Sequence, residues 1–432
     1  MGRTTRSGSR NHTPNVRPVQ RIELSEKHTR QRLIAVIACL IVASGAFIYA
    51  LNGLMSNDSG WTSIEASSSA ETNCGDDFIF QYYVGAAGVD ATAERKALTL
   101  LYTDALVKAY EVFHNDEAFE GVNNIYEINQ HPNEELTVDP VLYGAFETVA
   151  EYGRREIYLA PVYLEYKNLF FCNDDSETFH YDAEQNADVR TYFGEIAAYA
   201  NDPSMVNVEL LGDNRLKLHV SEEYLTYAKE NGIEKFVDFA WMQNAFITDY
   251  LADVMVEKGY TLGSISSCDG YTRNLDEGLT SEEGVLRQYS YNIYDRNSTT
   301  VYPAGLMNYT GPISMVSFHN YIMTEKEADH YYEFQNGETR TSYISIEDGR
   351  NRSSVNNLVA YSKRESCAQI LMQLIPVYIA DELDTDAVKT LATEQIYCIY
   401  GKNCTLYYTE KTLDLTDLFD KDGVSYKAQY LE

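Results

Sequence analysis

The sequence predicts an α/β fold (α+β), with a single large extracytoplasmic domain behind an N-terminal transmembrane helix. First, the apolar stretch 236–239 is typical of a strand and leads into a segment with apolar residues at helical spacings of 3 and 4, among them Phe246, Tyr250 and Leu251. Second, segments such as 206–220 and 287–360 alternate between apolar and polar residues, which favours sheet. Third, residues 33–55 form an apolar run without a charge.

The bulk composition indicates a globular protein that avoids polyanions. Hydrophobic residues make up 44% of the chain and charged residues 23%, which is the composition of a folded domain. The net charge of −31 is uneven, because residues 1–32 carry eight Lys or Arg against only Glu23 and Glu26. The strongly acidic remainder repels nucleic acid and anionic lipid, so neither is expected as a partner of the folded domain.

Residues 33–55 are predicted to cross the cell membrane once. Their 23 residues exceed the roughly 20 that a helix needs to span the hydrocarbon core. The basic flank precedes them, so the positive-inside rule places residues 1–32 in the cytoplasm and the rest of the chain outside. The alternative is a cleaved signal peptide cut near 43–45, but the apolar run is longer than the usual signal core.

The chain then divides into a basic cytoplasmic tail (1–32), the transmembrane helix (33–55), a Ser-rich linker (56–76) and an extracytoplasmic domain (77–432). Periodicity and capping residues predict the elements of that domain in order. These are a strand at 78–84, a helix at 91–113, a helix starting at Pro140 behind Asp139 or Thr137, a hairpin at 206–220, a helix at 221–231 and a helix at 366–379.

Seven cysteines are spread along the chain, and only Cys398 and Cys404 lie close together, on either side of a turn at 401–403. They are candidates for a disulfide, and the alternative is a set of buried free thiols. No Cys or His spacing matches a structural zinc site.

The stretch 237–254, read VDFAWMQNAFITDYLADV, resembles the central motif D-L-G-G-I-A-K-G-Y-A-V-D of the flavin-transferase (ApbE-like) family. Asp238 and Asp249 match the two acidic positions of that motif. The Gly-Gly pair is replaced by Ala240-Trp241, and Ala-Lys-Gly is replaced by 243–245, which places Asn244 at the lysine. The spacing of the motif is kept, while most of its chemical groups are changed.

Further blocks resemble the family's motifs in the same order, so that the resemblance covers roughly residues 125–374. They are 124–140; 153–166 (family G-A-F-D-I-T-V-G-P-L-V-x-L-W); 259–270 (a strand ending in N-L-G-G-D, with Asp269 at the acid); 343–349 (H-I-I-D-P-x-x-G, with Tyr343 at the histidine); and 366–379 (A-D-A-L-S-T-A-L). On this basis strands are expected at 157–161 and 343–346, beside the one at 236–239.

Family members bind FAD beside a magnesium ion and transfer FMN onto a Thr or Ser hydroxyl of a partner protein. The resemblance therefore implies a set of cofactor-binding positions, Asp238, Gln243, Asn244, Asp249 and Asp269. The metal-ligand positions fall near Cys367 and Leu371, which cannot hold Mg²⁺, so no metal ligand and no catalytic residue is predicted. Each Asp has a plainer interpretation as a helix cap or turn residue.

These departures favour a non-catalytic binding or scaffolding module, membrane-attached through 33–55, without a cofactor and with an unidentified extracytoplasmic protein partner. The alternative is a working FMN transferase that uses FAD and Mg²⁺ in a rearranged site. A second alternative is a cell-wall or glycan-binding surface protein, which would use Tyr-rich segments such as 330–332.

Overall fold

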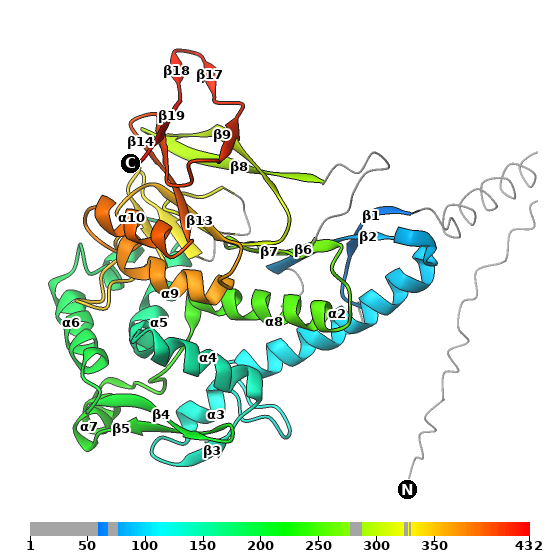
Figure 1. Cartoon of the computed structure of the whole chain (residues 1–432). Coiled ribbons are helices and arrows are strands. Elements are labelled where there is room, and N and C mark those ends of the chain that lie inside the picture. Colours follow the sequence, from blue (N-terminus) through cyan, green and yellow to red (C-terminus); the bar gives the residue numbers. More distant parts are fainter. Residues whose placement is uncertain (1–58, 68–76, 277–286, 324–326, 328–329) are drawn as a thin grey trace, which may run out of the picture. The chain divides into compact units, whose positions relative to one another are not determined.

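Nine strands hydrogen-bond into one sheet in the computed structural model, which describes residues 59–67, 77–276, 287–323, 327 and 330–432 (Figure 1). Neighbouring strands are antiparallel except for the last pair, which is parallel. In order across the sheet they are β1 (Gly60–Ile64), β2 (Phe78–Val84), β6 (Gly263–Ser267), β7 (Tyr271–Asn274), β10 (Ile313–His319), β13 (Asn357–Ser362), β14 (Tyr397–Lys402), β15 (Thr405–Tyr408) and β19 (Lys427–Tyr430).

Helices cover one face of this main sheet. Those that pack on its strands are α2 (Ala91–Phe113), α8 (Gln243–Glu257), α9 (Cys367–Tyr378) and α10 (Thr385–Thr393). On the same side of the sheet the domain also has α3 (Ile125–Gln130), α4 (Pro140–Glu151), α5 (Ala160–Phe170), α6 (Ala187–Asn201) and α7 (Glu222–Asn231). Helix α8 packs against β6 and β7, and α9 packs against β10 and β13. Side chains alternate along each strand, so Ile265, Phe318 and Leu358 enter the core shared with these helices.

A second, smaller sheet covers part of the opposite face. It consists of β8 (Gln288–Asn297), β9 (Thr300–Thr310) and β16 (Asp414–Thr416). Ile293 and Met307 from this sheet meet Met315, Val359 and Ile399 from the main sheet in a separate apolar core. The domain is therefore layered as helices, main sheet and small sheet.

Three further strand groups lie outside these layers. The hairpin of β4 (Val206–Gly212) and β5 (Arg215–Val220) pairs with β3 (Glu135–Thr137). Strand β11 (Tyr331–Glu333) pairs with β12 (Thr339–Thr341), and β17 (Asp420–Lys421) pairs with β18 (Val424–Ser425).

Local sequence signals account for several boundaries. Asp139 caps α4 by accepting the N–H of Val141 at 2.9 Å, and Pro140 is the first residue of that helix, as predicted. Ser221 caps α7 in the same way. Gly270, in the turn between β6 and β7, has a φ of +104°, and a Cβ there would lie 2.2 Å from the Ser317 carbonyl oxygen, so only glycine fits.

Four expectations need correction. The stretch 236–239 is irregular instead of a strand, residues 157–161 lie in a 3₁₀ turn and the start of α5, and 343–346 contributes only an isolated bridge from Ile344 to Asn351. These apolar runs are buried between helices and turns, where period alone does not separate strand from helix. Strand β1 lies inside the expected linker 56–76 and pairs with β2.

The predicted transmembrane helix 33–55 and the tail 1–32 lie outside the described residues. Within the described ranges, none of the helices is both long and apolar enough to cross a membrane.

Candidate functional site

Helix α8 carries three of the five predicted site residues, and the other two flank it. Gln243 and Asn244 open the helix and are half-buried, and Asp249 lies farther along and is buried. Asp238 lies just before the 3₁₀ turn Ala240–Met242 that leads into α8, and Asp269 lies in the turn between β6 and β7.

The Asp249 carboxylate binds the N-terminus of α9 and one arginine. It accepts the N–H groups of Cys367 at 3.0 Å and Ala368 at 2.8 Å, which are otherwise unsatisfied in the first turn of a helix. It also accepts an Arg273 N–H at 2.7 Å. Burial alone would lower the pKa of Arg273, but the carboxylate of Asp249 raises it overall. Asp249 is therefore a cross-link between α8, β7 and α9.

The two positions that the resemblance equates with metal ligands lie on α9 and are fully buried. Cys367 points its thiol at the carbonyl oxygens of Thr272 (3.3 Å) and Met315 (3.6 Å). Burial raises the pKa of this thiol well above its usual value, and the nearby Asp249 raises it further. Leu371 belongs to the apolar core. A neutral thiol and a leucine offer a magnesium ion no oxygen ligand.

Asn244 and Asp269 are brought together at the other end of α8. The Asn244 amide donates to one Asp269 carboxylate oxygen at 3.0 Å, and the second carboxylate oxygen is buried and has no hydrogen-bond partner among the described residues. Burial raises the pKa of Asp269, so the neutral acid is favoured relative to an exposed aspartate.

Aromatic rings fill the space beside this pair. The Trp241 and Tyr343 rings make an edge-to-face contact with centroids 5.3 Å apart, and both rings also meet Phe318, at 5.9 Å and 5.1 Å. Tyr378 packs against Phe318 and Tyr343 at 4.8 Å and 5.0 Å. These rings, here named the aromatic plug (Trp241, Phe318, Tyr343 and Tyr378), are all buried.

A small enclosed pocket of about 20 Å³ remains between the aromatic plug and a set of polar groups. It is bounded by Asp269, His319, Glu327 and His330, and the ring of His319 lies 3.4 Å from the Glu327 carboxylate. Such a volume admits about one water molecule, since a water needs roughly 10–15 Å³ of accessible space. His319 and Glu327 were not predicted, because they lie outside the recognised blocks and their spacing carries no signal. His330 was named only in the segment 330–332 of the glycan-binding alternative.

Asp238 belongs to a different environment. Its carboxylate accepts the N–H of Ala240 at 2.8 Å and the side-chain amide of Asn115, and its own N–H donates to the Ile157 carbonyl oxygen. Burial raises its pKa. Asp238 therefore caps the turn that leads into α8, in agreement with the plainer of the two interpretations of this residue.

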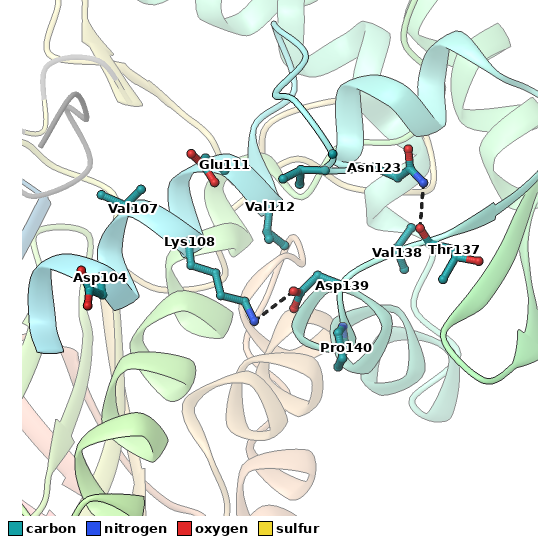
Figure 2. A pocket seen from close by; sticks show the side chains of 12 residues that line it. Asp104, Val107, Lys108, Glu111, Val112, Asn123, Thr137, Val138, Asp139 and Pro140 are labelled. Carbon is teal, nitrogen blue, oxygen red and sulfur yellow. Dashed lines mark hydrogen bonds and ion pairs between the residues drawn. The ribbon is translucent and has the colours of Figure 1, made fainter.

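A cavity of about 650 Å³ lies away from these residues, between α2 and the start of α4 (Figure 2). Lys108 crosses it to Asp139 at 2.9 Å, and Asn123 donates to the Thr137 carbonyl oxygen at 2.8 Å. None of the five predicted site residues lines it.

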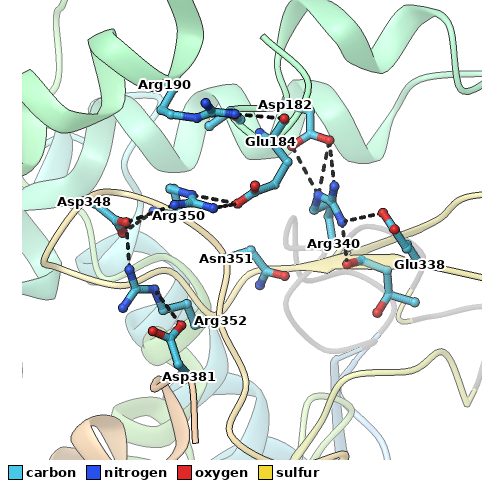
Figure 3. A network of polar contacts seen from close by, with 12 residues as sticks. Asp182, Glu184, Arg190, Glu338, Arg340, Asp348, Arg350, Asn351, Arg352 and Asp381 are labelled. Atoms are coloured by element: carbon cyan, nitrogen blue, oxygen red, sulfur yellow. Dashed lines mark hydrogen bonds and ion pairs between the residues drawn. The ribbon is translucent and has the colours of Figure 1, made fainter. Parts of the chain in front are cut away.

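A network of arginines and acids joins the segment after α5 to the loop that follows β12 (Figure 3). Arg340 binds the fully buried Asp182 at 3.0 Å, and Arg350 binds Glu184. Arg352 binds Asp348 at 2.8 Å. Each cation in this group has a carboxylate partner, so the network fastens the loop 343–352 and leaves no free charge for an anionic ligand.

Comparison with known proteins bears on the fold. No family model and no curated protein matches the sequence. Among solved structures, the ApbE protein of Thermotoga maritima superposes with a TM-score of 0.51 at 11% identity, covering 79% of this chain and 94% of that one. The flavin transferase ApbE of Vibrio cholerae gives a TM-score of 0.50 at 12% identity, with the same coverage. This chain has the ApbE-like fold that the sequence blocks predicted.

Proposed function

We propose that this chain is a non-catalytic member of the ApbE-like fold group, a binding or scaffolding module in which side chains occupy the former flavin site. One observation carries the proposal. Trp241 stands where the family motif has its second glycine, Tyr343 stands where it has a histidine, and the two rings pack directly on each other.

The residues present do not fit a flavin nucleotide. A pyrophosphate needs close backbone approach and positive charge, but Ala240 and Trp241 replace the glycines and Asn244 replaces the lysine. The enclosed pocket of about 20 Å³ is far below the roughly 300–1,000 Å³ of cofactor sites. Its lining includes no Lys or Arg.

The residues present do not fit magnesium either. Asp249 is the acid in contact with the equivalent position, and its oxygens are engaged by Arg273 and the first N–H groups of α9. In the part of the chain that the structure describes, no three His, Cys, Asp or Glu side chains are grouped so as to hold a metal ion.

The two alternatives have less support. A rearranged transferase would need Asp238, Asp249 and Asp269 to act together, but each is engaged by a separate set of neighbours. For a glycan-binding face at 330–332, Tyr331 is buried with its hydroxyl donating to the His319 carbonyl oxygen, and the Tyr332 hydroxyl binds Asp175. The Tyr331 ring is therefore covered, and the half-buried Tyr332 is the one tyrosine of this segment with an accessible edge.

We place the domain outside the cytoplasm, attached to the membrane through residues 33–55, with a protein partner there. The support for this is the uncharged run and its basic flank in the sequence. Protease treatment of intact cells tests it, since the domain should be degraded while residues 1–32 stay protected. Recovery of intact domain after such treatment would contradict the topology.

The decisive experiment is titration of the full-length chain, in detergent, with FAD and Mg²⁺, followed by flavin fluorescence. We expect no saturable change in flavin fluorescence up to about 1 mM FAD. A site with a binding free energy of only about −4 kcal/mol would already be half occupied at that concentration. A flavin transferase of known activity serves as the positive control. The control variant is Asn231→Leu, which changes an exposed asparagine at the end of α7. The proposal would be overturned by micromolar FAD binding that Asn244→Leu abolishes and Asn231→Leu leaves intact.

A further inference from the structure

The small sheet of β8, β9 and β16 covers only part of the second face of the main sheet. Over β13 and β14 the small sheet packs on the main sheet through apolar side chains. Ile293 and Met307 of the small sheet share a buried cluster with Val359 and Ile399 of the main sheet. Toward β6 and β7 the same face of the main sheet becomes polar. Strand register places Ser266 opposite Thr272. The backbone N–H of Ser317 on β10 donates to the carbonyl oxygen of Gly270.

The layers stand apart over this polar part, and a cleft of about 340 Å³ opens between them. Strand β8 supplies the facing wall through Ser290, Asn292 and Tyr294. The volume is at the lower end of the roughly 300–1,000 Å³ range of small-molecule sites. We name this cavity the hydroxyl cleft. It lies on the face of the sheet opposite α8 and α9, so it is separate from the former flavin site.

The lining of the hydroxyl cleft is rich in neutral hydrogen-bonding groups, and within the described ranges no Lys or Arg contributes to it. Hydroxyls and amides both donate and accept hydrogen bonds, and Tyr291, Tyr294 and Tyr321 add aromatic surface. The charged side chain in the lining is Glu327, whose carboxylate accepts the Met323 N–H at 2.7 Å and faces His319. Glu327 and His319 also bound the enclosed pocket, so they form the wall between the two cavities.

We propose that the hydroxyl cleft binds a neutral polyhydroxylated ligand, one or two uncharged sugar rings. Among the described lining residues an anion would meet no Lys or Arg, and it would be repelled by a chain of net charge −31. Several of the serine, threonine and asparagine groups already bond within the protein, as the Thr272 hydroxyl does to the Ser266 hydroxyl at 3.0 Å, but each hydroxyl keeps a further acceptor site that an apolar ligand would not use. A sugar matches both features of the lining, because its hydroxyls pair with these groups and its C–H faces pack on tyrosine rings.

This inference deepens the proposed binding role, but it concerns another face of the sheet. FAD binding would overturn the proposed function and leave the cleft untouched, whereas a failure of sugar binding would remove only the cleft proposal. The two are therefore tested by separate titrations on the same preparation.

The test is calorimetric titration of the full-length chain, in a detergent whose headgroup is not a sugar. The probes are cellobiose and N,N′-diacetylchitobiose, with glucuronate as the charged comparison. Tyr294→Ala removes a cleft ring whose hydroxyl has no hydrogen bond shown in the structure, and Asn292→Leu removes an exposed amide on the same strand. Tyr430→Ala, on β19 outside the cleft, is the matched control.

We expect saturable binding of at least one disaccharide, weakened at least about tenfold by Tyr294→Ala and by Asn292→Leu, and unchanged by Tyr430→Ala. Should Tyr294→Ala lose its cooperative thermal transition, Asn292→Leu alone decides, since its side chain is exposed. The proposal is overturned by no heat from either disaccharide up to about 10 mM. It is equally overturned by binding that the cleft substitutions leave unchanged, or by glucuronate binding as tightly as the neutral probes.

Discussion

The carboxylate of Asp249 accepts the backbone N–H of Cys367 at 3.0 Å, so an acid on α8 serves as a cap for the neighbouring helix α9. The two residues are 118 positions apart in the chain. In the family motif, both positions are associated with the cofactor site. Here they are bound to each other, and the contact is structural.

Removing the Asp249 carboxylate should therefore destabilise the fold. We expect Asp249→Ala to lower the free energy of unfolding by about 3–5 kcal/mol, because it leaves two helix N–H groups buried without an acceptor and leaves Arg273 only the more distant Asp253, at 3.6 Å. The control is Glu135→Ala, which breaks an ion pair with Arg215 whose side chains are 42% and 50% exposed. That change should cost no more than about 1 kcal/mol. Urea unfolding measures both, and equal losses would contradict a role for burial.

Truncation of the aromatic plug gives a second stability test. Trp241 is 6% exposed and meets Phe318 and Tyr343, so Trp241→Ala should cost about 3–5 kcal/mol. The chain's other tryptophan, Trp61, is 43% exposed, and Trp61→Ala should cost clearly less. Denaturant unfolding followed by circular dichroism is suitable, because it needs no tryptophan signal. A smaller loss at Trp241 than at Trp61 would refute the packing argument.

The buried carboxyl of Asp238 predicts a pH dependence with a defined sign. Burial raises its folded-state pKa above the ordinary value of about 3.9, so the folded state holds the proton more tightly than the unfolded state. Its contribution to stability is then fully present below about pH 4 and is lost as pH rises through the raised folded pKa. The Asp238→Asn variant has no titrating group at this position and does not lose stability in this way. The difference between its free energy of unfolding and that of the parent should therefore shift in favour of the variant as the pH rises.

Asp238→Asn also removes the oxygen that accepts the Asn115 amide. This loss lowers the free energy of unfolding of the variant by the same amount at every pH, so it does not change the slope. Asp213→Asn, at an exposed turn, is the control and should track the parent throughout. Unfolding free energies measured between about pH 3 and pH 8 decide the matter, and a difference that is flat or of opposite slope would show that the Asp238 pKa is not raised.

Thiol labelling tests the cysteine state. The disulfide considered for Cys398 and Cys404 is absent from the structure, where both thiols are free. Burial raises the pKa of Cys398 to about 12, and Cys367 is also buried, so both should resist alkylation until the protein unfolds. The half-buried Cys172 and Cys404 should label in the native state. Peptide mapping without reductant gives the readout, and a Cys398–Cys404 peptide would contradict it.

Much of the fold was predictable because its local signals are strong. The helix Ala91–Phe113 and the strand Phe78–Val84 match their predicted bounds, since each has an unbroken period. The segments at 157–161 and 343–346 were predicted wrongly as strands. Both segments are short and mostly apolar, because neighbouring helices surround them. Their sequence therefore shows no clear period, and tertiary packing decides their conformation.

The site was predictable only in part. The family resemblance assigned Asn244 and Asp269 to one set of cofactor-binding positions, and in the structure the two are hydrogen-bonded. It did not reveal that His319 and Glu327 bound the same pocket, because these residues come from the end of β10 and the segment after it, and only the fold brings them there. The contacts of Asp249 with Arg273 and α9 depend likewise on helix packing that no local pattern encodes.

The pairing of β2 with β6 has a consequence for how the chain reaches its native state. Phe80 lies opposite Ile265, so the intervening segment with helices α2 to α8 is a loop closed by two adjacent strands. Closing so long a loop costs entropy before the strand contacts repay it. Folding should therefore be slow and stepwise, with the helices forming early and the sheet closing late. During synthesis, the edge of β15 that pairs with β19 stays open until β19 has left the ribosome.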